Sequence, residues 1–256
     1  MIRLIENNSP ELENICARDV FGTRIAAYFR TYGAKFDFLK VWIQLDENEV
    51  PTAAISLMES DMTLTAFENA DFEELEFFIK ATPFSSLQCE RGVMKKLSLD
   101  ETLWGYVVEY EKLQPVDSEI VSFSVDFKAM YSLISSVGLL GVGDYLPWLS
   151  DITYRTNHGT AQPATICENG SLSACAAALF ITDNAALLGA VATEPSRRGN
   201  GFGGTLVKTL GNKMLKENRR TELLCKNDSI VEFYKSIGFT VSGEWAIFNR
   251  TLEDSQ

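Results

Sequence analysis

The sequence predicts an α+β fold, in which a mixed and mostly antiparallel sheet is flanked by helices in two tandem lobes. Three observations predict it. Apolar residues recur at helical spacing in several windows, and short apolar runs alternate with turn signals. In addition, the order of elements expected in the second half of the chain resembles the order expected in the first half. A length of 256 residues fits two domains. The proline-containing segment 114–119 is the expected linker, which gives domains 1–116 and 117–256.

In the second half of the chain, helices, an antiparallel meander and a glycine-rich turn are expected in a definite order. Asn169-Gly170 is a strong signal for a hairpin turn. The expected elements are helices over 125–137 and 143–155, strands over 160–168, 171–181 and 185–193, a helix over 204–218, a strand before Asn227, and a helix over 229–237.

The first half is interpreted as a degenerate copy of the same order. The expected elements are strands over 38–45, 52–58 and 62–67, a helix over 71–81, and strands over 85–89 and 104–113, the last of which would correspond to 243–252. Where a glycine turn would recur, the sequence has the acidic stretch FENADFEEL, which would repel phosphate. This lobe is therefore not expected to bind a phosphorylated cofactor as the second one does. The alternative is an unrelated α+β domain for substrate recognition.

The segment VATEPSRRGNGFGGTLV, residues 191–207, is the most informative part of the chain. A short apolar strand leads through a turn with two arginines and four glycines into an amphipathic helix. Glycines let backbone amides approach an anion, and free amides at a helix N-terminus favour phosphate. This turn therefore predicts a site for a phosphorylated cofactor.

Two motifs compete for these glycines. Gly199, Gly201 and Gly204 satisfy the G-x-G-x-x-G dinucleotide fingerprint, with Glu222 as a candidate ribose-binding acid, but residues 194–198 separate the strand from the first glycine. The pattern Arg-x-x-Gly-x-Gly, formed by Arg198, Gly201 and Gly203, fits better. It resembles the pyrophosphate loop of the GNAT superfamily of N-acetyltransferases. The downstream segment 223–245, with Asn227, Tyr234 and Gly238-Phe239, is also similar to that family.

The resemblance implies transfer of an acetyl group from acetyl-CoA to a primary amine of a small molecule or peptide. One strand, Val191, Ala192 and Thr193, would pair with the pantetheine arm, and the amide of residue 191 would face the thioester oxygen. Asn227 would contact the cofactor arm. The pyrophosphate would lie on the amides of a turn, aided by Arg197 or Arg198; the turn comprises Gly199, Asn200, Gly201, Phe202, Gly203 and Gly204.

Three residues are candidates for proton transfer. Tyr234 matches the family tyrosine that protonates the departing thiolate, and a phenol suits this because it stays protonated at neutral pH; it also lies on an apolar helix face, where a core aromatic would lie. Glu194 and His158 are alternative bases, although a loop carboxylate can simply be solvated and a lone histidine often makes structural hydrogen bonds. Tyr145 and Trp148 are candidate substrate-wall residues, with packing as the alternative.

Composition limits the remaining classes of function. Five scattered cysteines without C-x-x-C and a single histidine give little basis for a metal site, so no metal is expected. The net charge of −12 argues against nucleic-acid partners, and the sequence has neither a signal peptide nor an apolar run long enough for a membrane helix. We expect a cytoplasmic acetyltransferase, for which a homodimer is compatible with the sequence. A catalytically silent acyl-CoA sensor is the alternative.

Overall fold

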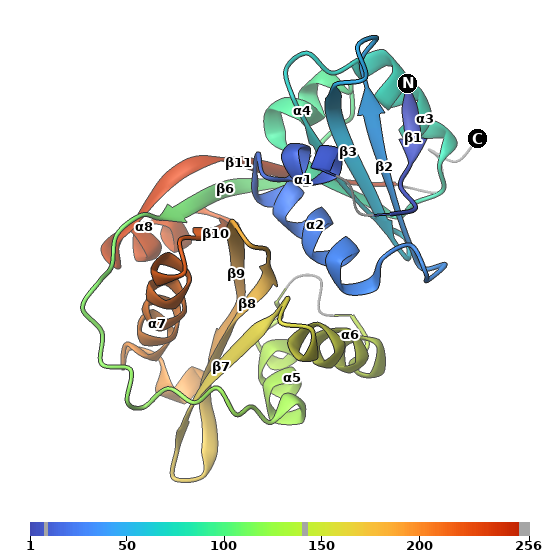
Figure 1. Ribbon diagram of the computed structural model, residues 1–256. Coiled ribbons are helices and arrows are strands. Elements are labelled where there is room, and N and C mark those ends of the chain that lie inside the picture. Colours follow the sequence, from blue (N-terminus) through green and yellow to red (C-terminus); the bar gives the residue numbers. More distant parts are fainter. Residues whose placement is uncertain (8–9, 140–142, 251–256) are drawn as a thin grey trace. The chain divides into compact units, whose positions relative to one another are not determined.

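The computed structural model describes residues 1–7, 10–139 and 143–250 (Figure 1). The chain folds into two compact units. The first contains Met1–Val107, Cys225–Asn227 and the residues from Ser242 onward, and the second contains Val108–Leu224 and Asp228–Val241. Among the described residues, no helix is both long and apolar enough to cross a membrane.

The first unit combines an antiparallel meander with four helices. Its helices are α1 (Pro10–Cys16), α2 (Val20–Tyr32), α3 (Phe72–Ala81) and α4 (Arg91–Lys96). Its strands are β1 (Ile2–Leu4), β2 (Leu39–Leu45), β3 (Pro51–Met58), β4 (Asp61–Ala66) and β5 (Ser86–Glu90), followed by β6 (Leu103–Tyr110). Strands β1 to β4 pair antiparallel in chain order, and β4 pairs parallel with β5. The strands and the helix predicted between 38 and 113 are confirmed, whereas β1, α1, α2 and α4 were not predicted.

A strand from the end of the chain completes the first unit. β11 (Phe239–Asn249) pairs antiparallel with β5, from Trp245 opposite Glu90 to Asn249 opposite Ser86. The Trp245 indole N–H donates to the Cys225 carbonyl at 3.0 Å, and both residues belong to this unit. Strands β6 and β11 therefore each contribute residues to both units.

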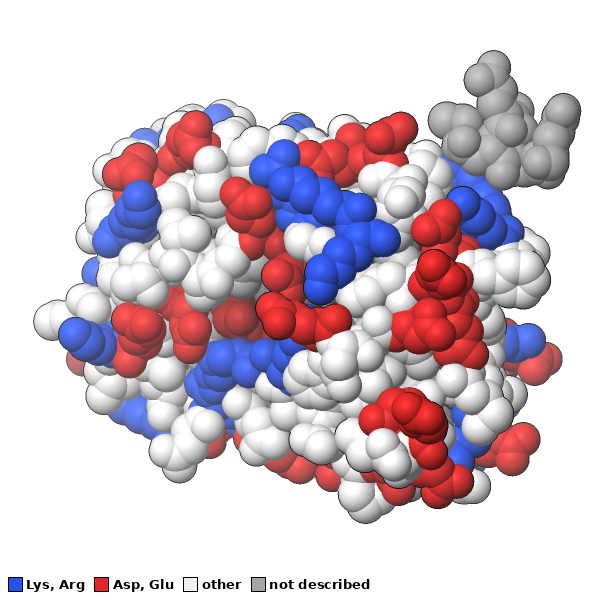
Figure 2. Space-filling model, turned by 90° about the horizontal axis from the view of Figure 1, so that it is seen from above, with Lys and Arg blue, Asp and Glu red and all other residues white. Residues whose placement is uncertain are grey.

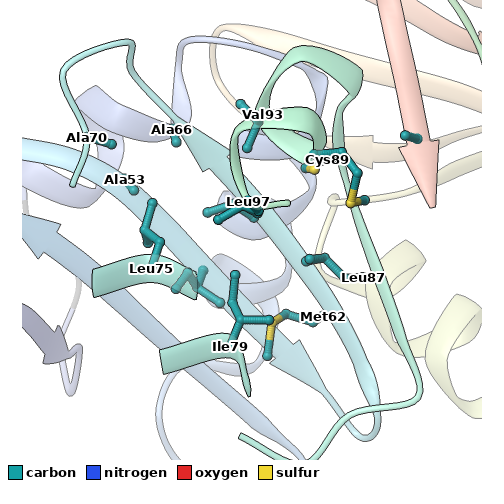
Figure 3. Close-up of a cluster of buried hydrophobic side chains, with 14 of the residues drawn as sticks. Ala53, Met62, Ala66, Ala70, Leu75, Ile79, Leu87, Cys89, Val93 and Leu97 are labelled. Atoms are coloured by element: carbon teal, nitrogen blue, oxygen red, sulfur yellow. The ribbon is translucent and has the colours of Figure 1, made fainter. Parts of the chain in front are cut away.

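The core of the first unit lies under α3 and α4 (Figure 3). Asp71 begins α3 by accepting a hydrogen bond from the Glu74 amide at 3.0 Å, and Leu75 and Ile79, one turn apart on the helix, point into the cluster. They meet Met62 of β4 and Leu87 of β5, all with at most 1% exposure. Burying each such side chain contributes about 1.5–3 kcal/mol, so this cluster fixes α3 on the sheet.

The second unit follows the predicted order of elements. It contains α5 (Phe127–Ser136), α6 (Tyr145–Asn157), β7 (Gln162–Glu168), β8 (Ser171–Ile181), β9 (Ala185–Thr193), the 3₁₀ turn η1 (Pro195–Arg197), α7 (Phe202–Lys216), β10 (Arg220–Cys225) and α8 (Asp228–Ser236). Strands β7, β8 and β9 form an antiparallel meander, and β9 pairs parallel with β10. The hairpin turn has positive φ at both Asn169 (51°) and Gly170 (77°), as the Asn-Gly signal predicts.

Helices cover both faces of this meander (Figure 1). α7 packs on β7, β8 and β9, while α5 packs on the other face of β8 and β9. Met130, Leu133 and Ile134 of α5 bury Cys175 and Ala192 of the strands. The predicted fold class is confirmed: an α+β architecture with a mixed, mostly antiparallel sheet and flanking helices.

The two halves of the chain have the same order of elements. The order helix, helix, three strands, helix, strand, helix, strand describes α1 to β6 and again α5 to β11. This agrees with the repeat expected from the sequence.

Candidate functional site: a strand that leaves its neighbour and an open helix N-terminus

β9 leaves its parallel neighbour halfway along its length. Pairing with β10 runs from Ala185 opposite Arg220 to Leu188 opposite Leu223, and β9 continues to Thr193. A bulge at this point shifts the register against β8, and Ala190 has φ +51°. In the described part of the chain, the predicted cofactor strand of Val191, Ala192 and Thr193 thus pairs with β8 only. Its other edge can accept an extended ligand.

The turn after β9 ends in an uncapped helix. Gly199 and Gly201 have φ of +88° and +79°, and no atom lies within 4 Å of where a Cβ would stand on either residue. Gly201 precedes α7, and no side chain caps that helix end. The first amides of α7 therefore have no capping side chain and lie at the positive end of the helix dipole, an arrangement that favours an anion. We refer to residues 194–204 as the glycine loop.

Two further glycines seat α7 against the strand. A Cβ on Gly203 would lie 3.5 Å from Thr193 Oγ1 and 3.7 Å from Val191 Cγ1, and one on Gly204 would lie 3.6 Å from Ile237 Cγ2. Behind them, α7 buries the predicted apolar stripe, which includes Leu206, Val207, Leu210 and Met214. The loop is consequently held close to the free edge of β9.

The two arginines of the loop have different surroundings. Arg197, in η1, has its Nη1 3.6 Å from Glu168 Oε2 at the end of β7. Arg198 is exposed, and in the described chain no ion pair engages it. Asn200 is exposed beside the glycines, and Asn227 is exposed between β10 and α8. Arg198 is thus the more available cation.

Tyr234 lies on α8 and is 5% exposed. Its ring packs edge-on against Phe239 at 5.3 Å and against Phe233 at 5.1 Å between ring centroids. This burial agrees with the expected position on the apolar face of the helix. A buried phenol here is compatible with both predicted roles, that of a proton donor to the thiolate and that of a core aromatic.

The two candidate bases are both engaged locally. Glu194 accepts a hydrogen bond from Ser196 within the loop. His158 ends α6, is exposed, and has Nδ1 2.8 Å from the Tyr154 carbonyl of its own helix. Two residues after His158, the Thr160 carbonyl accepts a hydrogen bond from the Ile181 amide. Ile181 in turn pairs with Ala186 near the start of β9. At about 3.3 Å per residue, His158 lies roughly 20 Å along the sheet from the loop at the end of β9. The structure therefore does not bring His158 to the loop.

The candidate substrate-wall residues form an aromatic group between α5 and α6. Tyr131 contacts Tyr145 at 4.9 Å and Trp148 at 5.3 Å, and its hydroxyl donates to the Gly143 carbonyl at 3.0 Å. Trp148 also packs against the cluster that contains Ala192. These contacts show packing between the two helices.

Sequence reasoning missed two features of this site, the bulge at Ala190 and the contact of Glu168 with Arg197. A positive φ at an alanine has no sequence signal. The dinucleotide interpretation gains no support, because Glu222 lies within β10 and binds Arg220 Nε at 3.0 Å.

The described residues contain no cluster of metal-ligating side chains. Cys175 and Cys225 are buried thiols, and burial raises the pKa of each to about 12.

Charged side chains are mixed over the surface. Of the described side chains seen in Figure 2, Lys and Arg stand in separate groups among many acidic ones. The glycine loop carries two arginines and one glutamate in a chain of net charge −12.

In this α+β fold, β9 separates from its parallel neighbour and leads into an uncapped, glycine-rich helix N-terminus. This arrangement suits an extended, phosphorylated ligand. Residues 163–241 match the family model described as the acetyltransferase (GNAT) domain. The match lies within the second half of the chain and agrees with the resemblance to the GNAT superfamily found in the sequence. A search of the curated proteins finds no match.

Solved structures of similar fold cover nearly the whole chain. One from Sphaerobacter thermophilus, a GCN5-related N-acetyltransferase, has a TM-score of 0.62 at 13% identity and covers 96% of this chain and 94% of its own. A Drosophila protein has a TM-score of 0.66 at 12% identity, covering 100% and 99%. A tandem GNAT protein from the clavulanic acid biosynthesis pathway has 0.57 at 12%, covering 96% and 97%. At these identities the likeness concerns the fold.

Proposed function

We propose that this protein is a cytoplasmic, acetyl-CoA-dependent N-acetyltransferase that acetylates a primary amine by direct attack on the thioester. The observation that carries the proposal is the free edge of β9 leading into the open N-terminus of α7. An extended pantetheine arm and a pyrophosphate together need this combination, a strand edge for amides and a helix start for anions.

Each step of the reaction has a candidate group in this domain. The amine nitrogen attacks the thioester carbon, and the Val191 amide at the free edge would stabilise the oxyanion that forms. The C–S bond then breaks, and the departing thiolate takes a proton from the Tyr234 hydroxyl. Glu194 would accept the amine proton through water once it leaves Ser196. Arg198 would hold the pyrophosphate together with the amides of the glycine loop.

We further propose that the first unit is a GNAT-like copy without a cofactor site. There, β4 pairs with β5 from Asp61 to Thr63 and then continues to Ala66, so the strands separate as β9 and β10 do. The separated strands are linked through Arg18 and Asp19, which lie between α1 and α2. Thr65 Oγ1 donates to Asp19 at 2.8 Å, and Arg18 binds both Asp19 and Glu90 at 2.9 Å.

The N-terminus of α3, the helix that follows β4, is also occupied by side chains of the protein itself. The Asp71 carboxylate caps α3, and Glu73 and Glu74 lie in its first turn. A phosphate would meet three carboxylates at this helix N-terminus instead of free amides. These contacts support one acetyl-CoA per chain, bound in the second unit.

A catalytically silent acyl-CoA sensor is the second candidate. One observation favours it: neither predicted base is poised, because Glu194 is bonded to Ser196 and His158 to its own helix. Under this proposal the glycine loop still binds acetyl-CoA, and no amine is acetylated.

Calorimetric titration with acetyl-CoA, with NAD as the control ligand, tests the binding site. Micromolar binding of acetyl-CoA but not NAD is expected, and binding of NAD alone would overturn the proposal. A panel of primary amines, assayed by release of free CoA thiol, then separates enzyme from sensor. Turnover that is lost in Tyr234→Phe while acetyl-CoA binding persists supports the enzyme. Binding without acetylation of any amine supports the sensor.

A further inference from the structure

A small network joins the β7–β8 hairpin to the start of the glycine loop. Ser173 of β8 is 2% exposed, and its carbonyl accepts a hydrogen bond from the Glu194 amide at 2.9 Å. Its hydroxyl donates to Glu168 Oε2 at 3.1 Å. The same carboxylate oxygen lies 3.6 Å from Arg197 Nη1. We call Glu168, Ser173 and Arg197 the loop clamp.

The clamp holds the turn that aims the glycines. Arg197 ends η1, the Arg197 amide bonds back to the Glu194 carbonyl at 2.8 Å, and Gly199 follows two residues later. Fixing η1 at both ends therefore fixes the direction in which the chain enters Gly199–Gly201. It also keeps Arg197 on the hairpin, whereas Arg198 is exposed and has no ion pair among the described residues.

A carboxylate near an anion site is unfavourable by charge alone. Glu168 would repel a pyrophosphate, so a favourable effect of this residue on binding must come from its contacts within the protein. Loops that are ordered before the ligand arrives bind more tightly, since less freedom is lost on binding. We propose that Glu168 is a positioning residue, which pre-forms the glycine loop by clamping Arg197 with the help of Ser173. This inference rests on the proposed function of the loop.

Two explanations for Glu168 predict opposite effects of its substitution on the affinity for acetyl-CoA. Glu168→Gln keeps the size of the side chain and a hydrogen-bond partner for Ser173, but removes the charge that holds Arg197. If the carboxylate only repels the ligand, acetyl-CoA binds more tightly to the variant. If the clamp orders the loop, acetyl-CoA binds about two- to fivefold more weakly, the range expected for a half-exposed ion pair.

The test compares acetyl-CoA with S-acetylpantetheine, which lacks the phosphates. We expect Glu168→Gln to weaken acetyl-CoA binding and to leave S-acetylpantetheine binding unchanged. The double variant Glu168→Gln/Arg197→Gln should bind acetyl-CoA no more weakly than Arg197→Gln alone, because both changes open the same clamp. Glu76→Gln on α3, which removes the carboxylate from another ion pair, is the matched control and should bind like the wild type.

Tighter or unchanged acetyl-CoA binding by Glu168→Gln would overturn the clamp while leaving the proposed function intact. Equal losses for both ligands would also overturn it, since they would show a general effect on the fold. A wild-type protein that binds neither ligand would refute the proposed function, and the clamp with it.

Discussion

Gly201 offers the sharpest test of the glycine loop, because its substitution should affect stability and binding separately. It precedes α7 in the left-handed region, with φ +79° and ψ 1°. Alanine in this region costs about 1–2 kcal/mol, whereas asparagine tolerates it better. Since no atom lies within 4 Å of the added Cβ, neither substitution creates a clash in the free protein. Gly201→Ala should therefore lower the free energy of unfolding by about 1 kcal/mol, and Gly201→Asn by less.

Binding should respond differently, because both variants place a Cβ in the open space over the amides. If the pyrophosphate approaches there, one charge-assisted hydrogen bond is lost, at about 1.5–3 kcal/mol. Each 1.4 kcal/mol is a factor of ten, so the Kd for acetyl-CoA should rise about ten- to a hundredfold in both variants. Urea denaturation without ligand gives the stability, and calorimetric titration gives the Kd.

Gly159→Ala is the matched control for Gly201. Gly159 also has positive φ (+71°) and open space around it, lies in the same unit, and stands outside the glycine loop. This variant should lose stability and keep its affinity. Acetyl-CoA binding by Gly201→Asn at wild-type strength would refute the idea that a ligand approaches the Gly201 backbone.

Further predictions concern catalysis, the core and stoichiometry. Tyr234→Phe should lower kcat about a hundredfold or more with little change in KM for acetyl-CoA, and unchanged turnover would exclude its role as proton donor. Trp245→Phe should lower the free energy of unfolding by about 1–3 kcal/mol in urea, because the Cys225 carbonyl loses its indole partner; equal stability would contradict this. Burial raises the pKa of Tyr110 to about 12, so this tyrosine ionises at lower pH in the unfolded chain than in the folded one. Between about pH 10 and 12, the free energy of unfolding of the wild type should therefore fall relative to that of Tyr110→Phe. Parallel pH dependences of the two proteins would disprove this. Titration should give one acetyl-CoA per chain, and two would show that the first unit also binds.

Elements with a single apolar face could be predicted from the sequence, and elements buried all round could not. α7 presents one stripe, so its periodicity predicts a helix. α2 is buried at ten of its thirteen residues, including Gly22 and Thr31, so residues that are not apolar lie among the buried ones and obscure the pattern. α4 has six residues, too few for a periodic signal. The pairing of β11 with β5 joins segments about 150 residues apart, which local patterns do not encode.

The turn and the helix start of the glycine loop could be predicted from its residue types, and its binding of a phosphate stays a prediction. Glycines and arginines at fixed spacing predict amides and charge for an anion. The bulge could not be predicted, since Ala190 takes positive φ only because β8 and β9 pair out of register on either side of it. The contact of Glu168 with Arg197 depends on the hairpin bringing the end of β7 to η1. Tertiary pairing decides both features.

The contrast between the two units explains why the backbone alone does not make a binding site. In each, a strand leaves its parallel neighbour after a few residue pairs and is followed by a helix. In the first unit, Asp19 accepts hydrogen bonds from the Thr65 hydroxyl and from an amide at the start of α2, and Asp71 caps α3 through the Glu74 amide, so side chains of the protein itself lie beside β4 and at the start of α3. In the second, Gly201 offers no such side chain, and the amides of α7 remain available. The order of elements is shared, so the proposed acetyl-CoA site depends on the bulge, the 3₁₀ turn and the glycines that follow β9 and not on the fold alone.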